Sequence, residues 1–478
     1  MKRFKTKRVI CMLLTMFSLS SCTWMGETTE NSVEENYSEA VKTILPDYDS
    51  ITADEMVLTG WYTPKVSLES FQTYKDCGFN YIFLQGRNVG SATSPLTEQA
   101  LQLCDELGLH AFVDITQAED LLLPAADLLS KYESFKGFCF DEPVIYKNTL
   151  NDRLGVFELS SYIEALRKQQ PRVEFLVNLN PTAAVGYPWG TPSFTYPEYL
   201  DAQQTYINAL YKDSDCMNWI SCDDYPLCYN TSAKKKYYLK AAWLQNLEYL
   251  ANEKRDSDIP LTSNFFIQSM PLGTDKNRVP TYEDLSLQMY SCMAYGYDSI
   301  SFFCYDTPPS TGEFNETQVA LLDREGNKTQ IWYDTQKLLS EIAKFSNTYM
   351  QFNDNWVGTL PILGSNNLAE DDMYYNNSFD CLLQPLSVNR LKGVKSVTAT
   401  EDTIVGYMQD SQGNPGYMVV NYNDTTYEKK SDMVFTFANC NKAYVYIDGV
   451  KQDVTLKNNQ LTLNLDIGEG VFVIPYVG

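Results

Sequence analysis

The chain has 478 residues, of which 61 are acidic and 37 basic, so its formal net charge is −24. A protein this acidic is repelled by phosphate backbones, and we expect no nucleic-acid partner. Its single histidine, His110, excludes a histidine-rich metal site and leaves a serine-type triad only one possible base. We expect His110 to be structural, because it opens a predicted strand rather than ending one.

The N-terminus has the pattern of a bacterial lipoprotein signal. Basic residues precede a short apolar stretch at 9–19, which runs into Leu-Ser-Ser-Cys at 19–22. That stretch is far shorter than the ~20 residues of a membrane span. We therefore expect residues 1–21 to be a signal peptide, Cys22 to be acylated, and residues 22–54 to form an acidic tether. The protein would then be lipid-anchored to a bacterial membrane, at the outer membrane or cell surface. An ordinary secretory signal with a chance cysteine is the alternative.

Residues 55–348 alternate short apolar runs with longer segments of helical periodicity. Eight strand–helix units in succession predict an α/β fold, a (β/α)8 TIM barrel. The nearly continuous apolar runs are typical of parallel strands buried on both faces. The predicted strands are 56–64, 80–87, 110–117, 135–143, 173–181, 217–226, 261–270 and 297–308.

Residues 349–478 have a different pattern. The segment 403–423 consists of two alternating runs around a Gly/Asn/Pro turn, and Asp448-Gly449 is a hairpin signal. The segment 461–476 again reads as strand, turn and strand. This part predicts a separate antiparallel β-sandwich.

Polar and aromatic residues gather at the predicted strand ends, where the chemistry of a TIM barrel lies. Hydroxyl-rich ligands need such carboxylates and amides, with aromatic faces on which to stack. No cysteine or histidine cluster has metal spacing, and no phosphate loop or dinucleotide fingerprint competes. We therefore expect an oligo- or polysaccharide ligand, no metal and no cofactor. The strand-end residues are Trp61, Tyr62, Gln85, Arg87, Asp114, Asp141, Glu142, Asn178, Asn180, Asp223, Asp224, Tyr225, Gln268, Tyr305 and Asp306.

Several short motifs resemble the clan-A (β/α)8 glycoside hydrolases. "GWYTP" followed by "YKDCGFNYIFL" looks like the opening strand–helix unit of that clan, and "FDEP" resembles its Asn-Glu-Pro at the end of strand 4. "DDYP" and "MAYGYDSISFFCYDTP" resemble barrels of glycoside hydrolases from gut-type bacterial polysaccharide-degrading systems. A β-sandwich after the barrel is also common there.

The resemblance implies catalytic roles by position. Glu142 matches the acid/base glutamate of the clan, whereas Asp141 stands where the clan has asparagine. Gln268 stands where the clan has its nucleophilic glutamate, but some barrel glycosidases pair acids on strands 4 and 6 instead. We therefore expect Glu142 to be the general acid, Asp224 the base or nucleophile, and Asp141 to raise the pKa of Glu142. Because side chains alternate along a strand, either Asp223 or Asp224 must face away.

The expected function is that of a glycoside hydrolase. The alternative is a surface glycan-binding lipoprotein on a decayed glycosidase barrel, which Gln268 favours. A structural or adhesive lipoprotein without a sugar site is the third reading. The expected substrate-binding residues are Trp61, Arg87, Asn180, Tyr225, Gln268, Tyr305 and Asp306.

Overall fold

The computed structural model describes residues 41–116, 122–145, 154–182, 196–229, 237–272, 278–311, 314–366 and 378–478. The expected signal peptide and Cys22 lie outside these residues. The described residues belong to one compact unit. Among the described helices, none is both long and apolar enough to cross a bilayer.

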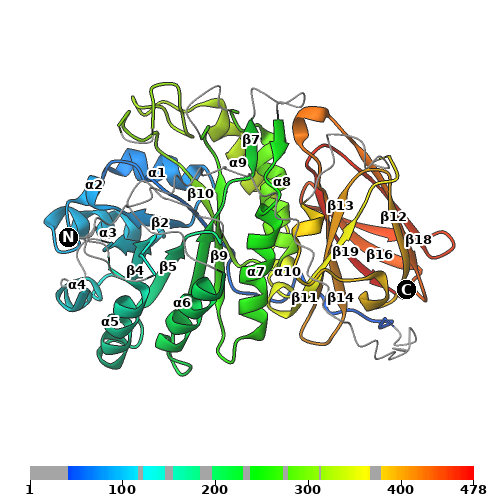
Figure 1. Cartoon of the computed structure of the whole chain (residues 1–478), viewed down its shortest axis with the longest axis horizontal. Helices are drawn as coiled ribbons and strands as arrows, with labels where there is room; N and C mark the ends of the chain where they lie inside the picture. Colours follow the sequence, from blue (N-terminus) through cyan, green and yellow to red (C-terminus); the bar gives the residue numbers. More distant parts are fainter. Residues whose placement is uncertain are drawn as a thin grey trace, which may run out of the picture. The chain divides into compact units, whose positions relative to one another are not determined.

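Eight parallel strands form a nearly closed barrel in the order β1-β10-β9-β6-β5-β4-β3-β2 (Figure 1). Between the first and last strands, the Asn80 N–H donates to the Leu58 carbonyl at 3.1 Å, and the Leu58 N–H donates to Asn80 Oδ1 at 2.8 Å. The predicted TIM barrel is confirmed. Its strands are β1 Val57–Gly60, β2 Tyr81–Leu84, β3 His110–Asp114, β4 Phe135–Asp141, β5 Glu174–Leu179, β6 Trp219–Asp223, β9 Thr262–Gln268 and β10 Ser299–Phe303.

Helices alternate with these strands and cover the outside of the barrel (Figure 1). A small hairpin, β7 Leu227–Tyr229 with β8 Tyr237–Leu239, follows β6 before the next long helix begins. The helices are α1 Leu68–Asp76, α2 Gly86–Val89, α3 Pro95–Leu107, α4 Leu122–Leu129, α5 Val156–Gln169, α6 Tyr196–Ala209, α7 Trp243–Asp256, α8 Tyr282–Ala294, α9 Gln330–Ile342 and α10 Ser346–Tyr349.

Side chains alternate between the helix-facing core and the barrel interior, as the period of a strand requires. Much of the interior is aromatic. The rings of Phe112 and Trp219 pack edge to face with their centroids 5.3 Å apart, and Phe83 stacks on Phe266 at 6.0 Å. Such pairs fill the interior as a packed core rather than a pore.

The C-terminal part is an antiparallel β-sandwich, as predicted. A six-stranded sheet has the order β11-β13-β14-β19-β16-β17, and a three-stranded sheet has the order β12-β15-β18. Apolar residues between them form a separate core, which includes Val405, Tyr417 and Phe435. The strands are β11 Trp356–Ile362, β12 Val394–Ala399, β13 Thr403–Gln409, β14 Pro415–Asn421, β15 Ser431–Phe437, β16 Lys442–Ile447, β17 Val450–Thr455, β18 Gln460–Leu465 and β19 Gly470–Tyr476.

The β-sandwich is fastened to the barrel by buried polar contacts. Arg278, just before α8, forms ion pairs with Asp284 and, at 2.7 Å, with Asp424 of the β-sandwich. The Tyr427 hydroxyl, in the short 3-10 helix Thr425–Tyr427, donates to the Tyr237 carbonyl of the β7–β8 hairpin at 2.8 Å. The β-sandwich therefore supports a loop that leaves the carboxyl end of β6.

A buried acid lies at the opposite end of the barrel from the strand ends discussed above. Glu174, the first residue of β5, accepts a 2.7 Å hydrogen bond from Trp219 Nε1. Burial raises the pKa of the Glu174 carboxyl to about 7, and this hydrogen bond opposes the rise.

We expect Glu174→Gln to remove a pH-dependent cost of folding. The folded protein holds the Glu174 proton up to about pH 7, whereas an unfolded chain releases it near ~4.3. The free energy of unfolding of the wild type therefore falls as pH rises between these values. The glutamine variant should gain on the wild type by roughly 3–4 kcal/mol across this window, measured by urea denaturation. A stability difference that stays constant over the same pH range would contradict the burial of a titrating acid here.

Candidate functional site

Two acids meet at the carboxyl ends of β4 and β6. The side-chain amide of Asn178, on the strand between them, donates to Asp223 Oδ1 at 3.0 Å and to Asp141 Oδ1 at 3.4 Å. An amide nitrogen carries two hydrogens, so it can bond both carboxylates at once. The strand register agrees, because Asp141 pairs with Asn178, and Asn178 pairs with Ser221, two residues before Asp223. Asp141 and Asp223 therefore face the same space at the barrel mouth.

Asp223 has the electrostatics of a group that can carry a proton near neutral pH. Burial raises the pKa of the Asp223 carboxyl to about 6, and the like charge of Asp224 adds to the rise. The hydrogen bonds from Asn178 and Tyr225 and the positive charge of Lys240 oppose it. Asp223 is thus the kind of carboxyl that serves as a general acid or base.

Asp224 faces the other way, towards α7. Its carboxylate is ion-paired with Lys240 and accepts a 2.8 Å hydrogen bond from Asn246 Nδ2 and a 3.1 Å bond from the backbone N–H of Tyr225. These partners hold it as a structural anchor between the barrel and its helices. Of the two neighbouring acids, the contacts favour Asp223 over the expected Asp224 as the one that faces Asp141.

Glu142 follows directly at the end of β4, and its backbone is strained. The Glu142 N–H donates to the Asn178 carbonyl at 2.9 Å, and the side chain is buried. Its φ is +42°, in the left-handed region, although Pro143 follows and favours an extended residue before it. Tyr62, at the end of β1, has φ of +54°. Such strain in bulky residues gathers at functional sites, so both positions support a site at this end of the barrel.

A third acid lies on the β1–β10 side of the mouth. Burial raises the pKa of Asp306 to about 7, against the positive charges of Arg87 and Lys65. The Arg87 guanidinium lies 4.5 Å from the centre of the Tyr62 ring, and the Asp306 N–H donates to the Tyr62 carbonyl at 2.8 Å. Asp306, Arg87 and Tyr62 therefore form one corner of the mouth.

The expected aromatic platforms have different surroundings. Tyr225 is half-buried, with its ring centre 5.1 Å from that of Phe303, so part of it faces the mouth. Trp61 is buried more deeply, packed edge to face on Phe83 at 5.1 Å. Tyr305 is fully buried, 4.7 Å from Tyr74 by ring centres, in the core on the helix side. The structure thus places Tyr305 away from the other expected ligand-binding residues.

The two amide side chains that were expected to bind the substrate differ in their hydrogen bonding. Gln268 is buried, and both ends of its side-chain amide are occupied: Oε1 accepts from the Leu227 N–H and Nε2 donates to the Met270 carbonyl, each at 3.2 Å. This amide supports the β7–β8 hairpin. In contrast, Asn180 Oδ1 is buried and has no hydrogen-bond partner among the described residues. Asn180 therefore keeps an acceptor for a ligand hydroxyl, whereas Gln268 does not.

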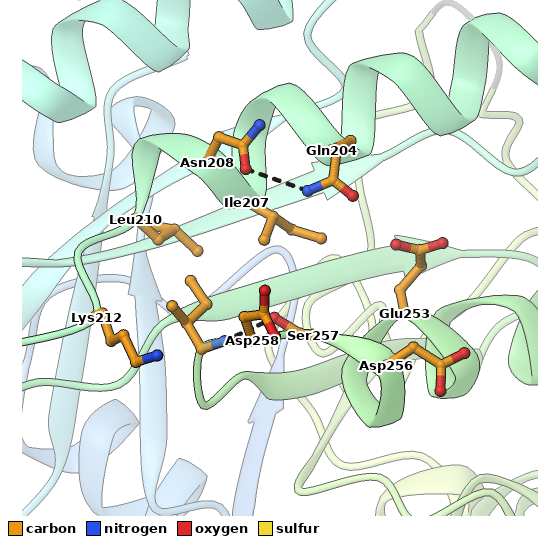
Figure 2. Close-up of a pocket in the computed structure, with 10 residues that line it drawn as sticks. Gln204, Ile207, Asn208, Leu210, Lys212, Glu253, Asp256, Ser257 and Asp258 are labelled. Atoms are coloured by element: carbon orange, nitrogen blue, oxygen red, sulfur yellow. Dashed lines mark hydrogen bonds between the residues drawn. The ribbon is translucent and has the colours of Figure 1, made fainter.

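A pocket of about 390 Å³ lies elsewhere, between α6 and α7 (Figure 2). It is lined near the C-terminal ends of the two helices, by residues that include Asn208, Lys212, Glu253 and Asp258. Helices of a TIM barrel run antiparallel to its strands, so this pocket lies at the amino ends of the strands, away from the mouth. Among the described residues, no three His, Cys, Asp or Glu side chains are grouped to hold a metal ion.

Comparison with solved structures finds chains of similar fold that are glycoside hydrolases. No family model and no curated protein matches the chain. A catalytic mutant of a GH42 beta-galactosidase from G. stearothermophilus is similar in structure, with a TM-score of 0.53 and 9% identity over 88% of this chain and 98% of that chain. A family 39 glycoside hydrolase from the gut symbiont Bacteroides cellulosilyticus WH2 gives 0.47 and 11%, over 88% and 81%. At 9% identity the likeness to the GH42 enzyme concerns the fold alone, and at that level it agrees with the expected (β/α)8 barrel.

Asp223 and Asp224 allow a matched test of these assignments. They are adjacent in sequence and similarly buried, with exposed fractions of 6% and 3%. Asp224→Asn should lower the free energy of unfolding by about 1–3 kcal/mol, since it breaks the Lys240 ion pair and turns amide hydrogens towards buried donors. Asp223→Asn should leave stability unchanged or raise it at about pH 8, because it removes a buried charge. Urea denaturation measures both. The reverse ranking would contradict the assignment of Asp223 to the mouth.

Proposed function

We propose that the chain hydrolyses glycosidic bonds at the carboxyl ends of its barrel strands. The observation that carries the proposal is the pair formed by Asp141 and Asp223 around the Asn178 amide, with the pKa of Asp223 raised to about 6. Hydrolysis of a glycosidic bond needs one carboxylic acid that donates a proton and one ionised carboxylate. The glycoside hydrolase fold of the structural neighbour supports this reading as an analogy only.

In the proposed reaction, protonated Asp223 donates its proton to the leaving-group oxygen while the Asp141 carboxylate bonds to the anomeric carbon. Water then attacks that carbon, gives a proton back to Asp223 and releases Asp141. The two carboxylate oxygens lie 3.0 and 3.4 Å from one nitrogen atom. They are therefore closer than the ~6.5–9.5 Å of inverting enzymes, which favours retention of configuration.

Glu142 remains the second acid from β4, at the position that the family resemblance favours. Its strained backbone places it beside Asp141 at the mouth. In this proposal it lines the site beside the two reacting carboxyl groups. Asn180 binds a sugar hydroxyl, Tyr225 and Tyr62 offer ring faces, and the corner formed by Asp306 and Arg87 holds further hydroxyls. The ligand is an oligo- or polysaccharide.

The alternative is a glycan-binding protein on a barrel that has lost catalysis. One observation favours it: the end of β9 carries Gln268, whose amide is bonded to backbone groups, instead of a carboxylate. A neutral amide cannot act as a nucleophile. This alternative predicts glycan affinity without turnover.

Asp223→Asn should lower turnover of unactivated glycans by ~10²–10⁴-fold, because the leaving group loses its proton donor. An activated aryl glycoside needs no proton, so its cleavage should suffer less. Asp141→Asn should slow both substrates alike, since it removes the nucleophile. The wild type should lose activity above about pH 6, as Asp223 loses its proton. Turnover is measured on a panel of glycans and their aryl glycosides.

Glu142→Gln is the control that separates the two acids. If this variant, rather than Asp223→Asn, shows the penalty that depends on the leaving group, Glu142 is the general acid and the assignment to Asp223 fails. Binding of a glycan in the panel without cleavage of any would establish the glycan-binding alternative.

We further propose that Cys22 anchors the mature protein to a bacterial membrane, at the outer membrane or cell surface. The proposal rests on the basic, apolar and Leu-Ser-Ser-Cys pattern of residues 1–22. Cys22→Ala should abolish metabolic labelling with a fatty-acid analogue and move the protein from the membrane to the soluble fraction, or block its maturation. Unchanged membrane association of the variant after fractionation would remove the lipoprotein reading.

A further inference from the structure

A chain of hydrogen bonds runs through the barrel interior to the Asp141–Asp223 pair. Ser221 Oγ donates to Asn178 Oδ1 at 3.0 Å, and Asn264 Nδ2 donates to Ser221 Oγ at 2.8 Å. The hydroxyls of Ser299 and Ser301 each donate to Asn264 Oδ1 at 2.8 Å. The chain thus connects β10, β9, β6 and β5, and all its members are buried.

The bonds all point in one direction. An ionised carboxylate can only accept, so the Asn178 amide must turn its hydrogens towards Asp141 and Asp223. Its oxygen then needs a donor, which is the Ser221 hydroxyl. Because that hydroxyl has a single hydrogen, it accepts in turn from Asn264. Bonds aligned in this way polarise one another and strengthen the last donor of the chain.

We propose that Ser221 and Asn264 are positioning residues, which act through Asn178 to orient the Asp141 and Asp223 carboxylates and to stabilise their negative charge. The inference deepens the proposed glycosidase site and rests on it for its catalytic meaning. A purely structural role is the competing account. TIM-barrel interiors are usually filled by branched apolar residues, and a buried amide that loses a partner costs about 1–3 kcal/mol. If these polar residues only filled the barrel interior, their hydrogen-bond donors would not have to point towards the acids.

Other groups around Asp223 also set the pKa of its carboxyl, and the hydrogen-bond chain acts together with them. The like charge of Asp224 raises the pKa of Asp223, the hydrogen bond from Tyr225 and the charge of Lys240 lower it, and Asp141 faces it across Asn178. From β9, the sequence Thr-Ser-Asn-Phe-Phe-Ile-Gln contributes no titratable side chain. A change made in the interior chain therefore reaches Asp223 through Asn178, without altering a charge near it.

Ser221→Ala and Ser263→Ala form a matched pair of variants. Ser221 is 0% and Ser263 1% exposed, and both hydroxyls donate inside the fold. Ser263, on β9, donates instead to Asp298 Oδ2 at 2.9 Å, outside the interior chain. Each variant loses one buried hydroxyl, but only Ser221→Ala leaves Asn178 Oδ1 without its donor.

The experiment follows the carboxyl carbon of Asp223 by NMR in the full chain with labelled aspartate, assigned by its loss in Asp223→Asn. Ser221→Ala should raise the pKa of Asp223 by on the order of half to one unit, because the donor to the carboxylate weakens. Ser263→Ala should not move it. Ser301→Ala, which removes one of two donors to Asn264, should give a smaller rise and serves if Ser221→Ala does not fold.

An unchanged pKa in Ser221→Ala and Ser301→Ala, or an equal shift in Ser263→Ala, would overturn the inference. The titration needs no substrate, so its outcome is separate from that of the glycan assays. If Ser221→Ala shifts the pKa of Asp223 but the wild type cleaves no glycan, the role of the hydrogen-bond chain is supported and the proposed hydrolase activity is rejected. Where cleavage occurs, the limb of the pH–rate profile set by Asp223 should move by the same amount in Ser221→Ala.

Discussion

The double hydrogen bond from Asn178 to Asp141 and Asp223 is the constraint on which the arrangement of the mouth depends. Two acids that meet at a buried strand end repel each other and lose solvation. One amide that bonds both offsets part of this cost and holds both towards the same space. The remaining polar interior follows from it, because an amide oriented by carboxylates needs a donor on its other side. Ser221 donates to the Asn178 oxygen, and Asn264 donates to Ser221. Two serine hydroxyls in turn donate to the Asn264 oxygen.

The fold could be predicted from the sequence because its signals repeat along the chain. Eight apolar runs separated by helical segments indicate a parallel barrel, and the alternating runs after residue 349 indicate an antiparallel domain. The strand ends could be located for the same reason, and Asp141, Glu142 and Asp223 do lie there. Which of Asp223 and Asp224 faces inwards could not be determined, because a one-residue change of register exchanges the two faces of a strand. Only the contacts to Asn178 and to Asn246 decide it.

The positioning residues, which affect the acids only through Asn178, could not be predicted from the sequence. Ser221 and Asn264 are ordinary polar residues in apolar runs, and only their alternation with Trp219, Asp223 and Phe266 shows in retrospect that they share a face. Tyr305 illustrates the opposite difficulty. It lies beside Asp306 near the end of a predicted strand, yet its ring packs on Tyr74 in the core on the helix side, where it buries its apolar surface. Two residues that are adjacent in sequence at a strand end can therefore place their side chains in different layers, one at the mouth and the other in the core between strands and helices.

Gln268 is the residue on which the two functional readings divide, and its contacts give it a structural reason. Its amide accepts from Leu227 and donates to Met270 at the same time, which joins the start of the β7–β8 hairpin to the end of β9. A glutamate in its place would accept from Leu227 but would turn its other oxygen towards the Met270 carbonyl, which also only accepts. An acid at this position is thus incompatible with this anchoring of the hairpin. The Gln268 contacts thus give the lack of a carboxylate on β9 a structural reason, and they exclude a nucleophile from β9 without touching the acids on β4 and β6.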